Sequence, residues 1–440
     1  MYCFLFNFFY WRYDMSMLEA AAQAKKASIK LAASSTKLKN KALKNIAEVL
    51  VANKKMIITA NQLDLEQSEA EHLEAPLLKR LRFDDAKIEE VVEGIHSLIK
   101  LEDPVGQELL KTELDHGLML VKESCPIGLI GVIFESRPDA LVQIASLCLK
   151  SGNAVMLKGG SEAKRTNKVL TELIVQATDE AGIPSAWIHN IESRAEVSKM
   201  LGLDEYIDLI IPRGSNAFVR YIIENSRIPV LGHADGICHG YIHRDADIQM
   251  AVDVALDSKT QYVAVCNAME TLLVHRGIAK EFLPKLAAAY APFNVRIHGC
   301  EKTQMIIDCE SATEQDWKTE YLDYEISIRI VDSMEDAIEH INTYGSGHTE
   351  TIVTQNKDKA KTFMMLVDSG NVFHNCSTRF SDGFRYGFGA EVGISTNKIH
   401  ARGPVGLDGL LIYKYKLYGH GQIAGDYAQG IKKFTHRHIK

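Results

Sequence analysis

The sequence lacks the features that would place it on a nucleic acid or in a membrane. Acidic residues outnumber basic ones by 57 to 50, for a formal net charge of -7. The chain is therefore not a polycation built to neutralise phosphates. Its longest strongly apolar internal run, residues 127–134, is far shorter than the ~20 residues needed to cross a bilayer. We expect a globular protein with no nucleic-acid partner and no membrane association.

Paired cysteines are also absent. The eight cysteines are scattered and none form a CxxC motif, which argues against a zinc finger and against thioredoxin-like chemistry. Scattered thiols are typical of a reducing compartment, so we expect a cytoplasmic protein. The histidines lack HExxH or another metal-ligand spacing, so the sequence predicts no metal site; they include His233, His239, His340 and His348.

The N-terminus is rich in aromatic residues, eight among the first 13. It is too short to span a membrane, and it lacks the basic start and cleavage site of a secretory signal. We therefore treat residues 1–16 as an extension outside the fold. Two interpretations stay open: a misassigned start, with Met15 or Met17 as the true first residue, or a tail that binds a membrane surface or a partner.

Hydrophobic periodicity predicts the fold class. Residues 17–101 have helical spacing, residues 109–121 read as a strand or hairpin, and residues 410–417 read as a strand. From residue 127, short apolar runs that read as strands alternate with predicted helices. The strands are at 127–134, 154–157, 207–211 and 229–231, and the helices are at 139–150, 161–180 and 215–225. A second series of strands lies at 241–243, 271–275, 326–331, 350–354 and 371–373. This alternation predicts two α/β units, each with a parallel sheet.

Two glycine turns favour a dinucleotide site. Residues 157–161 and 211–215 each follow a strand, contain a basic residue and glycine, and lead into a helix. Such turns present backbone N–H groups to anions at the carboxyl end of a strand. The Walker motif GxxxxGK[ST] and a true GxGxxG are both missing. Plain connecting turns are the alternative interpretation.

Two further stretches could carry chemistry. Cys266 lies among small and polar residues just before a strand, so it is either a nucleophile or a buried packing residue. Residues 371–391 are rich in arginine, aromatics and glycine. Such a stretch is either an anionic-substrate loop or a long surface loop, because arginine binds carboxylate and phosphate in bidentate fashion.

Six segments, together with their order, resemble the γ-glutamyl phosphate reductases (glutamate-5-semialdehyde dehydrogenases), a branch of the aldehyde dehydrogenase superfamily. They lie at residues 126–139, 207–215, 232–239, 266–275, 340–350 and 387–396. The resemblance runs from about residue 17 to 422 and implies an aldehyde-dehydrogenase-like α/β fold, with two open parallel-sheet domains and a β-flap for oligomerisation. The implied domains are NADPH-binding (17–108 and 129–239, with a return at 398–409), catalytic (240–397), and flap with tail (109–128 and 410–440).

The resemblance also implies an activity, the reduction of L-glutamyl 5-phosphate by NADPH to L-glutamate 5-semialdehyde and phosphate, in proline biosynthesis from glutamate. Cys266 would attack the acyl carbon and expel phosphate, and the thioester would accept a hydride. The implied oxyanion donors are the Cys266 backbone N–H and a group near Ser136, or Asn267 instead. A homo-oligomer is implied, and a separate glutamate 5-kinase partner is left open.

The implied cofactor contacts are Lys158, Gly160, Ser161, Arg213, Gly214, Ser215 and, at the nicotinamide ribose, Glu325. NAD-preferring relatives carry a carboxylate where this chain has Ser161, with Lys164 and Arg165 nearby, so the sequence favours NADPH. The candidates for the substrate's anions are Arg137, Arg379 and Arg385. Those for its ammonium group are Asp382 and Glu391.

One departure from the hydrolytic relatives carries a further prediction. Those enzymes hold a water-activating glutamate upstream of the cysteine, and this chain has His233 at that register. Loss of the carboxylate would protect the thioester from water, so we expect no water-dependent dehydrogenase activity. Two alternatives stay open: a hydrolytic semialdehyde dehydrogenase, and a non-catalytic scaffold that has kept the fold.

Overall fold

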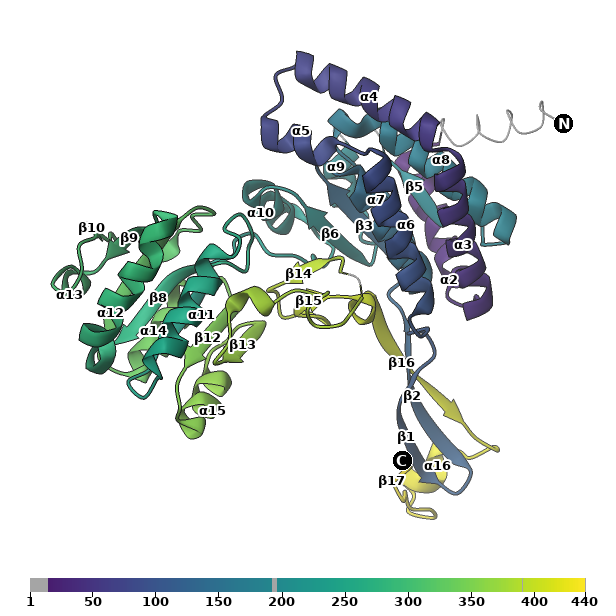
Figure 1. Ribbon diagram of the computed structural model, residues 1–440. Coiled ribbons are helices and arrows are strands. Elements are labelled where there is room, and N and C mark those ends of the chain that lie inside the picture. The colour runs from purple at the N-terminus through teal and green to yellow at the C-terminus, as the bar shows by residue number, and fades with distance from the viewer. Residues whose placement is uncertain (1–14, 192–195, 390, 440) are drawn as a thin grey trace. The chain divides into compact units, whose positions relative to one another are not determined.

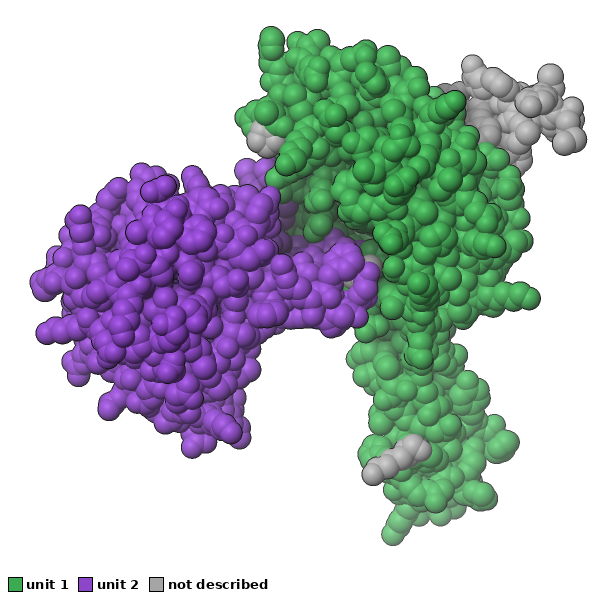
Figure 2. All heavy atoms as spheres, viewed as in Figure 1, with its two compact units in different colours: residues 1–214, 221–230, 406–440 green, residues 215–220, 231–405 purple. Residues whose placement is uncertain are grey.

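The computed structural model describes residues 15–191, 196–389 and 391–439 (Figure 1). The expected extension 1–16 therefore lies almost entirely outside the described residues. Contacts divide the chain into two compact units (Figure 2). Unit 1 comprises residues 1–214, 221–230 and 406–440, and unit 2 comprises residues 215–220 and 231–405. In the part of the chain that is described, no helix has both the length and the apolar character to span a membrane.

Unit 1 contains a parallel sheet with the strand order β5-β4-β3-β6. The strands are β3 (Leu129–Phe134), β4 (Ala154–Lys158), β5 (Ile188–Asn190) and β6 (Leu209–Arg213). Every residue of β3 and β4 is buried, as expected when helices cover both faces of a parallel sheet. Helices α7 (Pro138–Lys150) and α8 (Lys164–Ala181) follow β3 and β4, and α9 (Glu196–Met200) precedes β6.

The N-terminal part of unit 1 is helical, as its periodicity predicts. It comprises α2 (Met17–Leu31), α3 (Thr36–Ala52), α4 (Lys54–Ala70), α5 (Ala75–Leu81) and α6 (Asp85–Lys100). Helix α3 packs against α6 and α8, and α4 packs against α8. The apolar stripe of α3 is fully buried at Leu43, Ile46 and Leu50, as expected for an amphipathic helix that packs on other helices.

A second sheet of unit 1 is antiparallel, with the order β16-β2-β1-β17. Its strands are β1 (Glu108–Asp115), β2 (Leu118–Pro126), β16 (Leu411–Tyr418) and β17 (Arg437–Ile439). Strand β16 pairs with β2 from Leu411↔Pro126 to Tyr418↔Met119. The two strand segments predicted at 109–121 and 410–417 thus belong to one sheet. The short α16 (Ala424–Ala428) precedes β17.

Unit 2 contains a parallel sheet with the order β10-β9-β11-β8-β7-β12-β13. Its central strands are β7 (Cys238–Ile242), β8 (Met269–His275), β11 (Glu325–Val331), β12 (Thr349–Val353) and β13 (Asn371–His374). Strands β9 (Arg296–Gly299) and β10 (Glu310–Ser311) extend one edge. A separate hairpin pairs β14 (Gly393–Ser395) with β15 (Gly403–Val405). The sequence-based boundary at residue 240 falls inside β7.

Helices cover both faces of this sheet. They are α11 (Ile248–Thr260), α12 (Arg276–Tyr290), α14 (Met334–Tyr344) and α15 (Lys357–Leu366), with the short α13 (Glu301–Gln304) near β9. Successive strand residues point to opposite faces. Ile242 and Leu272 therefore lie in one hydrophobic core, and Tyr241 and Leu273 in the other. The prediction of two parallel-sheet units is confirmed.

A buried carboxylate anchors the helix that follows the first glycine turn. Asp64 on α4 is 1% exposed and lies at the N-terminus of α8. It accepts hydrogen bonds from the backbone N–H of Arg165 at 3.2 Å, and from the backbone N–H and hydroxyl of Thr166 at 2.8 and 2.7 Å. An anion at this position satisfies unpaired helix donors and complements the helix dipole.

We predict that Asp64→Ala lowers the free energy of unfolding of unit 1 by about 2–3 kcal/mol, because buried donors lose a charged acceptor. Asp85→Ala is the control, since that carboxylate is 69% exposed and should change stability by less than about 0.5 kcal/mol. Urea unfolding followed by circular dichroism measures both. Equal effects of the two variants would contradict the capping role.

Candidate active site

Cys266 lies half-buried in the loop between α11 and β8. A buried ion pair joins the two ends of this loop: Lys259 Nζ lies 2.6 Å from Glu270 Oε2, and both side chains are 0% exposed. The backbone N–H of Leu322 donates to the other Glu270 oxygen at 3.3 Å. Burial raises the pKa of Glu270 to about 7 and lowers that of Lys259. The pair therefore fixes the loop at the cost of taking two charges out of water.

The segment that enters β7 lies directly against the backbone of Cys266. A Cβ atom on Gly236 would lie 2.5 Å from Cys266 Cα and 2.7 Å from its carbonyl carbon, so only glycine fits there. Two residues on, the Cys238 thiol donates to the Cys266 carbonyl oxygen at 3.1 Å. The segment at the start of β7 thus fixes the position of the Cys266 backbone.

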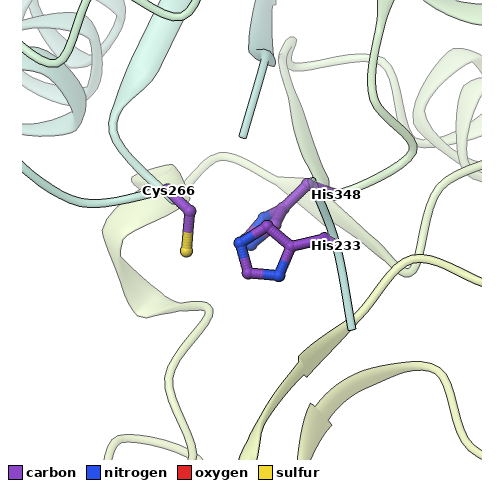
Figure 3. Close-up of side chains that lie close together, drawn as sticks. All are labelled: His233, Cys266 and His348. Atoms are coloured by element: carbon purple, nitrogen blue, oxygen red, sulfur yellow. The ribbon is translucent and has the colours of Figure 1, made fainter. Parts of the chain in front are cut away.

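Two imidazoles lie beside the Cys266 side chain (Figure 3). One ligand atom from each of His233, Cys266 and His348 lies within 4.8 Å of the other two, and the two rings meet edge to face at 4.9 Å between centroids. His233 Nδ1–H donates to the carbonyl of Ile394 at 2.9 Å. His348 is fully buried, which lowers its pKa well below the ordinary value, and its Nδ1 lies 2.8 Å from the Thr349 hydroxyl.

The topology explains this convergence. The segments that carry His233, Cys266 and His348 precede β7, β8 and β12, respectively. These three strands are neighbours in the sheet, so the segments before them meet at its amino edge. The proximity of His348 to the cysteine had no signal in the sequence, because nothing in its spacing connects it to Cys266.

Asn267 is buried and tied to a neighbouring loop. Its Nδ2 donates to the Ser381 carbonyl at 2.7 Å, and its own carbonyl accepts from the Thr378 hydroxyl at 2.8 Å. These contacts hold residues 378–381 against the cysteine loop. The role of Asn267 in the structure is thus to position this loop, and its role as an oxyanion donor stays a prediction.

The two predicted substrate arginines of unit 2 lie together. Arg379 is buried, and its Nε donates to Gln261 at 2.9 Å. Arg385 donates to the Arg379 carbonyl at 2.8 Å. Burial and the charge of Arg385 lower the pKa of Arg379, while Cys266 acts to raise it. The Arg379 guanidinium is thus a cation within electrostatic range of the thiol.

The two predicted ammonium acceptors shape the loop that contains them. Asp382 Oδ1 accepts from the backbone N–H groups of Phe384 and Arg385, each at 3.0 Å. Glu391 Oε2 accepts from the Gly383 N–H at 2.7 Å. Both carboxylates are therefore partly engaged within residues 382–391, and contact with a substrate ammonium stays a prediction.

In unit 1, the predicted cofactor turns meet at the carboxyl edge of the sheet. Strand β3 pairs with both neighbours, in the registers Ile133↔Lys158 and Phe134↔Arg213. This brings together the ends of β3, β4 and β6, and with them Ser136, Lys158, Gly160, Ser161, Arg213 and Gly214, followed in the chain by Ser215. Arg137 immediately precedes α7, and its guanidinium Nη2 lies 3.6 Å from Asp139 Oδ2. The edge is where open α/β sheets bind ligands.

This edge already holds an anionic side chain. The backbone N–H and hydroxyl of Ser136 donate to Glu162 Oε1 at 2.6 and 2.7 Å. Ser136 has a positive φ of 44°. Strained backbone conformations of this kind are frequent at functional sites. The donors of Ser136 thus face the turn 159–162, and its role as an oxyanion donor stays a prediction.

Glu325 is engaged elsewhere, and a second glutamate, Glu320, contacts the segment that lies against the Cys266 backbone. Glu325 begins β11 and binds Arg296 and, at 3.0 Å, His298; burial acts to raise its pKa, but these hydrogen bonds hold it below the ordinary value. Glu320 accepts from the Asn216 amide and the Gly236 backbone, and burial raises its pKa. The sequence did not identify Glu320. Its only signal there is its position shortly before the strand predicted at 326–331, and Glu325 has the same signal.

Comparisons with known proteins extend over nearly the whole chain. The aldehyde dehydrogenase family model matches residues 14–316. Two relatives are gamma-glutamyl phosphate reductases, from Acetivibrio thermocellus and Pelotomaculum thermopropionicum. They are 67% and 65% identical to this chain, over 96% of this chain and 98% of each relative. The crystal structure of a gamma-glutamyl phosphate reductase from Thermotoga maritima matches with a TM-score of 0.90 and 42% identity, over 92% of this chain and 99% of that one.

We predict that Lys259→Met destabilises unit 2 by about 3–5 kcal/mol, because it leaves Glu270 buried without its partner. The double variant Lys259→Met/Glu270→Leu should recover most of that loss, since an apolar pair carries no desolvation cost. Lys302→Met is the control, because its pair with Asp332 is 55% and 49% exposed. Urea unfolding of the four proteins measures the effect. A double variant no more stable than the single one would show that packing, not charge, holds the loop.

Proposed function

The chain belongs to the aldehyde dehydrogenase family, and from this premise we propose that it reduces L-glutamyl 5-phosphate to L-glutamate 5-semialdehyde with NADPH and releases phosphate. The observation that carries the proposal is a thiol, Cys266, held in a fixed loop with the His233 imidazole beside it. The near-complete match to gamma-glutamyl phosphate reductases supplies the substrate class. The reaction is a step of proline biosynthesis from glutamate.

Cys266 performs the covalent chemistry. Its thiolate attacks the acyl carbon, the bond from that carbon to the phosphate oxygen breaks, and inorganic phosphate leaves. After reduction of the thioester, the carbon–sulfur bond of the hemithioacetal breaks, and the aldehyde and the thiolate are restored. The Cys266 backbone N–H is the oxyanion donor that this scheme requires. Its position depends on Gly236, because the two backbones are in direct contact.

Phosphate, and not water, is the acyl acceptor in the reverse direction. The residue at the register of the water-activating glutamate is His233, and its Nδ1–H is already committed to the Ile394 carbonyl. We propose that the loss of the carboxylate leaves the thioester resistant to hydrolysis. Arg379, close enough to Cys266 to affect it electrostatically, is our proposed contact for the leaving phosphate.

The remaining charged candidates are assigned to the amino-acid end of the substrate. Arg385 is the proposed partner of its carboxylate, and Arg137, which lies in unit 1, is a separate candidate for a substrate anion. Asp382 and Glu391 are the proposed acceptors for its ammonium, each through a carboxylate that also folds the loop.

Members of this family use nicotinamide cofactors, and the edge of the unit 1 sheet fits one. The donors of Ser136 already bind the Glu162 carboxylate, so the edge accommodates an anion. When bound, NADPH supplies the hydride for the thioester. Lys158, Gly160 and Ser161 would hold its adenosine end, and Arg213, Gly214 and Ser215 its pyrophosphate. For the nicotinamide ribose, Glu320 is a second candidate besides Glu325, because it lies beside Gly236.

Assembly and location complete the proposal. We expect copies of the chain to associate through β16, whose free edge exposes Ile412, Tyr413, Tyr415 and Leu417. We also expect the enzyme to act in a reducing compartment, which keeps its thiol available. A separate glutamate 5-kinase would supply the labile acyl phosphate.

We predict that the reverse reaction requires both phosphate and Cys266. Purified enzyme with NADP⁺ and the semialdehyde should form NADPH only when inorganic phosphate is added, and Cys266→Ala should lower the rate by at least about 10³-fold. NADPH formation without phosphate would replace the proposal with a hydrolytic dehydrogenase. No turnover from folded protein under either condition would favour the scaffold.

We also predict that Gly236→Ala lowers kcat by about 100-fold, because even a shift of about 1 Å at a nucleophile has that effect. Gly94→Ala is the matched control, since nothing lies within 4 Å of a Cβ at that position; it should retain full activity. Steady-state kinetics test both variants. Normal kcat in Gly236→Ala would mean that this contact does not position the cysteine.

A further inference from the structure

We propose that His233, Cys266 and His348 form a binding site for a thiophilic divalent cation of the Zn²⁺ type, and that its occupancy blocks the nucleophile. The binding part of the proposal stands on the geometry alone. The inhibitory part rests on the proposed function, because it takes Cys266 to be the group that attacks the substrate.

The donor set and its spacing match zinc. One thiolate and two imidazoles are ligands that Zn²⁺ prefers. Zinc bonds of about 2.0–2.3 Å place tetrahedral ligand atoms roughly 3.5 Å apart. The three ligand atoms already lie within 4.8 Å of one another, so small side-chain rotations would complete the site. Figure 3 shows both rings next to the Cys266 side chain.

The outer contacts of the two histidines are those of metal ligands. A ligating histidine commonly donates its second ring N–H to a carbonyl or another oxygen, which fixes the ring and the tautomer. His233 does so to the Ile394 carbonyl at 2.9 Å. The Nδ1 of His348 lies 2.8 Å from the Thr349 hydroxyl. In both rings Nδ1 is thus engaged, which assigns Nε2 as the ligand atom.

A second, independent observation points to a ligand. His348 is 0% exposed, and its Nε2 has no hydrogen-bond partner among the residues that the structure describes. A buried polar atom without a partner costs about 1–3 kcal/mol, and coordination would remove that cost. Cys266 would bind as the thiolate and give its proton to the buffer. Its sulfur lone pair would then be unavailable to an acyl carbon.

Cobalt(II) is the probe for this site, because it substitutes for zinc and is coloured. Tag-free, chelator-treated full-length protein should bind one Co²⁺ per chain, with a thiolate-to-cobalt charge-transfer band and tetrahedral d–d bands. Cys266→Ser should abolish the charge-transfer band, and His233→Ala and His348→Ala should each weaken binding by more than about 100-fold. The matched controls, Cys309→Ser and His420→Ala, change residues outside the cluster and should bind as the parent does.

The outcomes separate the proposal from the function proposed above. Wild-type protein without the charge-transfer band, or a band that persists in Cys266→Ser, would overturn the site. If His348→Ala fails to fold, His233→Ala alone still decides, since that residue is only half-buried. In the activity assay, Zn²⁺ should inhibit reversibly and a chelator should restore the rate. A cobalt band in a protein without reductase activity would support the site and refute only the function.

Discussion

The buried ion pair between Lys259 and Glu270 is the interaction on which the candidate active site depends. Cys266 lies in a loop whose residues 261–266 are exposed or half-buried, and the pair joins the ends of that loop at 2.6 Å inside unit 2. Two charges out of water are tolerated only when they are held together and hydrogen-bonded. The N–H of Leu322 supplies a further bond to Glu270. The pair thus fixes the last turn of α11 against the start of β8, and with them the two ends of the loop that contains Cys266.

The same sheet then determines what surrounds the thiol. Strands β8, β7 and β12 are neighbours, and the segments ahead of them bring Cys266, His233 and His348 to one amino edge. Gly236 allows the β7 segment to touch the Cys266 backbone because it has no side chain. In unit 1, by contrast, the two glycine turns lie at the carboxyl ends of β4 and β6. The candidate nucleophile and the candidate cofactor turns thus lie at opposite edges of their respective sheets, the amino edge in unit 2 and the carboxyl edge in unit 1.

This difference explains how far the sequence could predict the site. Apolar runs such as residues 129–134 and 271–275 specify buried strands, and glycine turns after strands follow a general rule for anion sites. No comparable rule marks the amino edge of a sheet, so His348 could not be connected with Cys266. The orientation of Asn267, whose amide binds Ser381, depends on long-range packing. For the same reason Glu320 could not be distinguished from Glu325 by position alone.

In the two proposals, the identity of residue 233 links reaction choice to metal affinity. A carboxylate there could activate water, and it would add a hard oxygen donor beside the thiol. Histidine removes the carboxylate, and with it the base used by hydrolytic relatives. It also places a second imidazole next to a thiolate, and imidazole and thiolate are the donors that soft and borderline cations select. In the two proposals, the residue that would keep water from the thioester is therefore the same residue that supplies the second imidazole of a zinc-type ligand set.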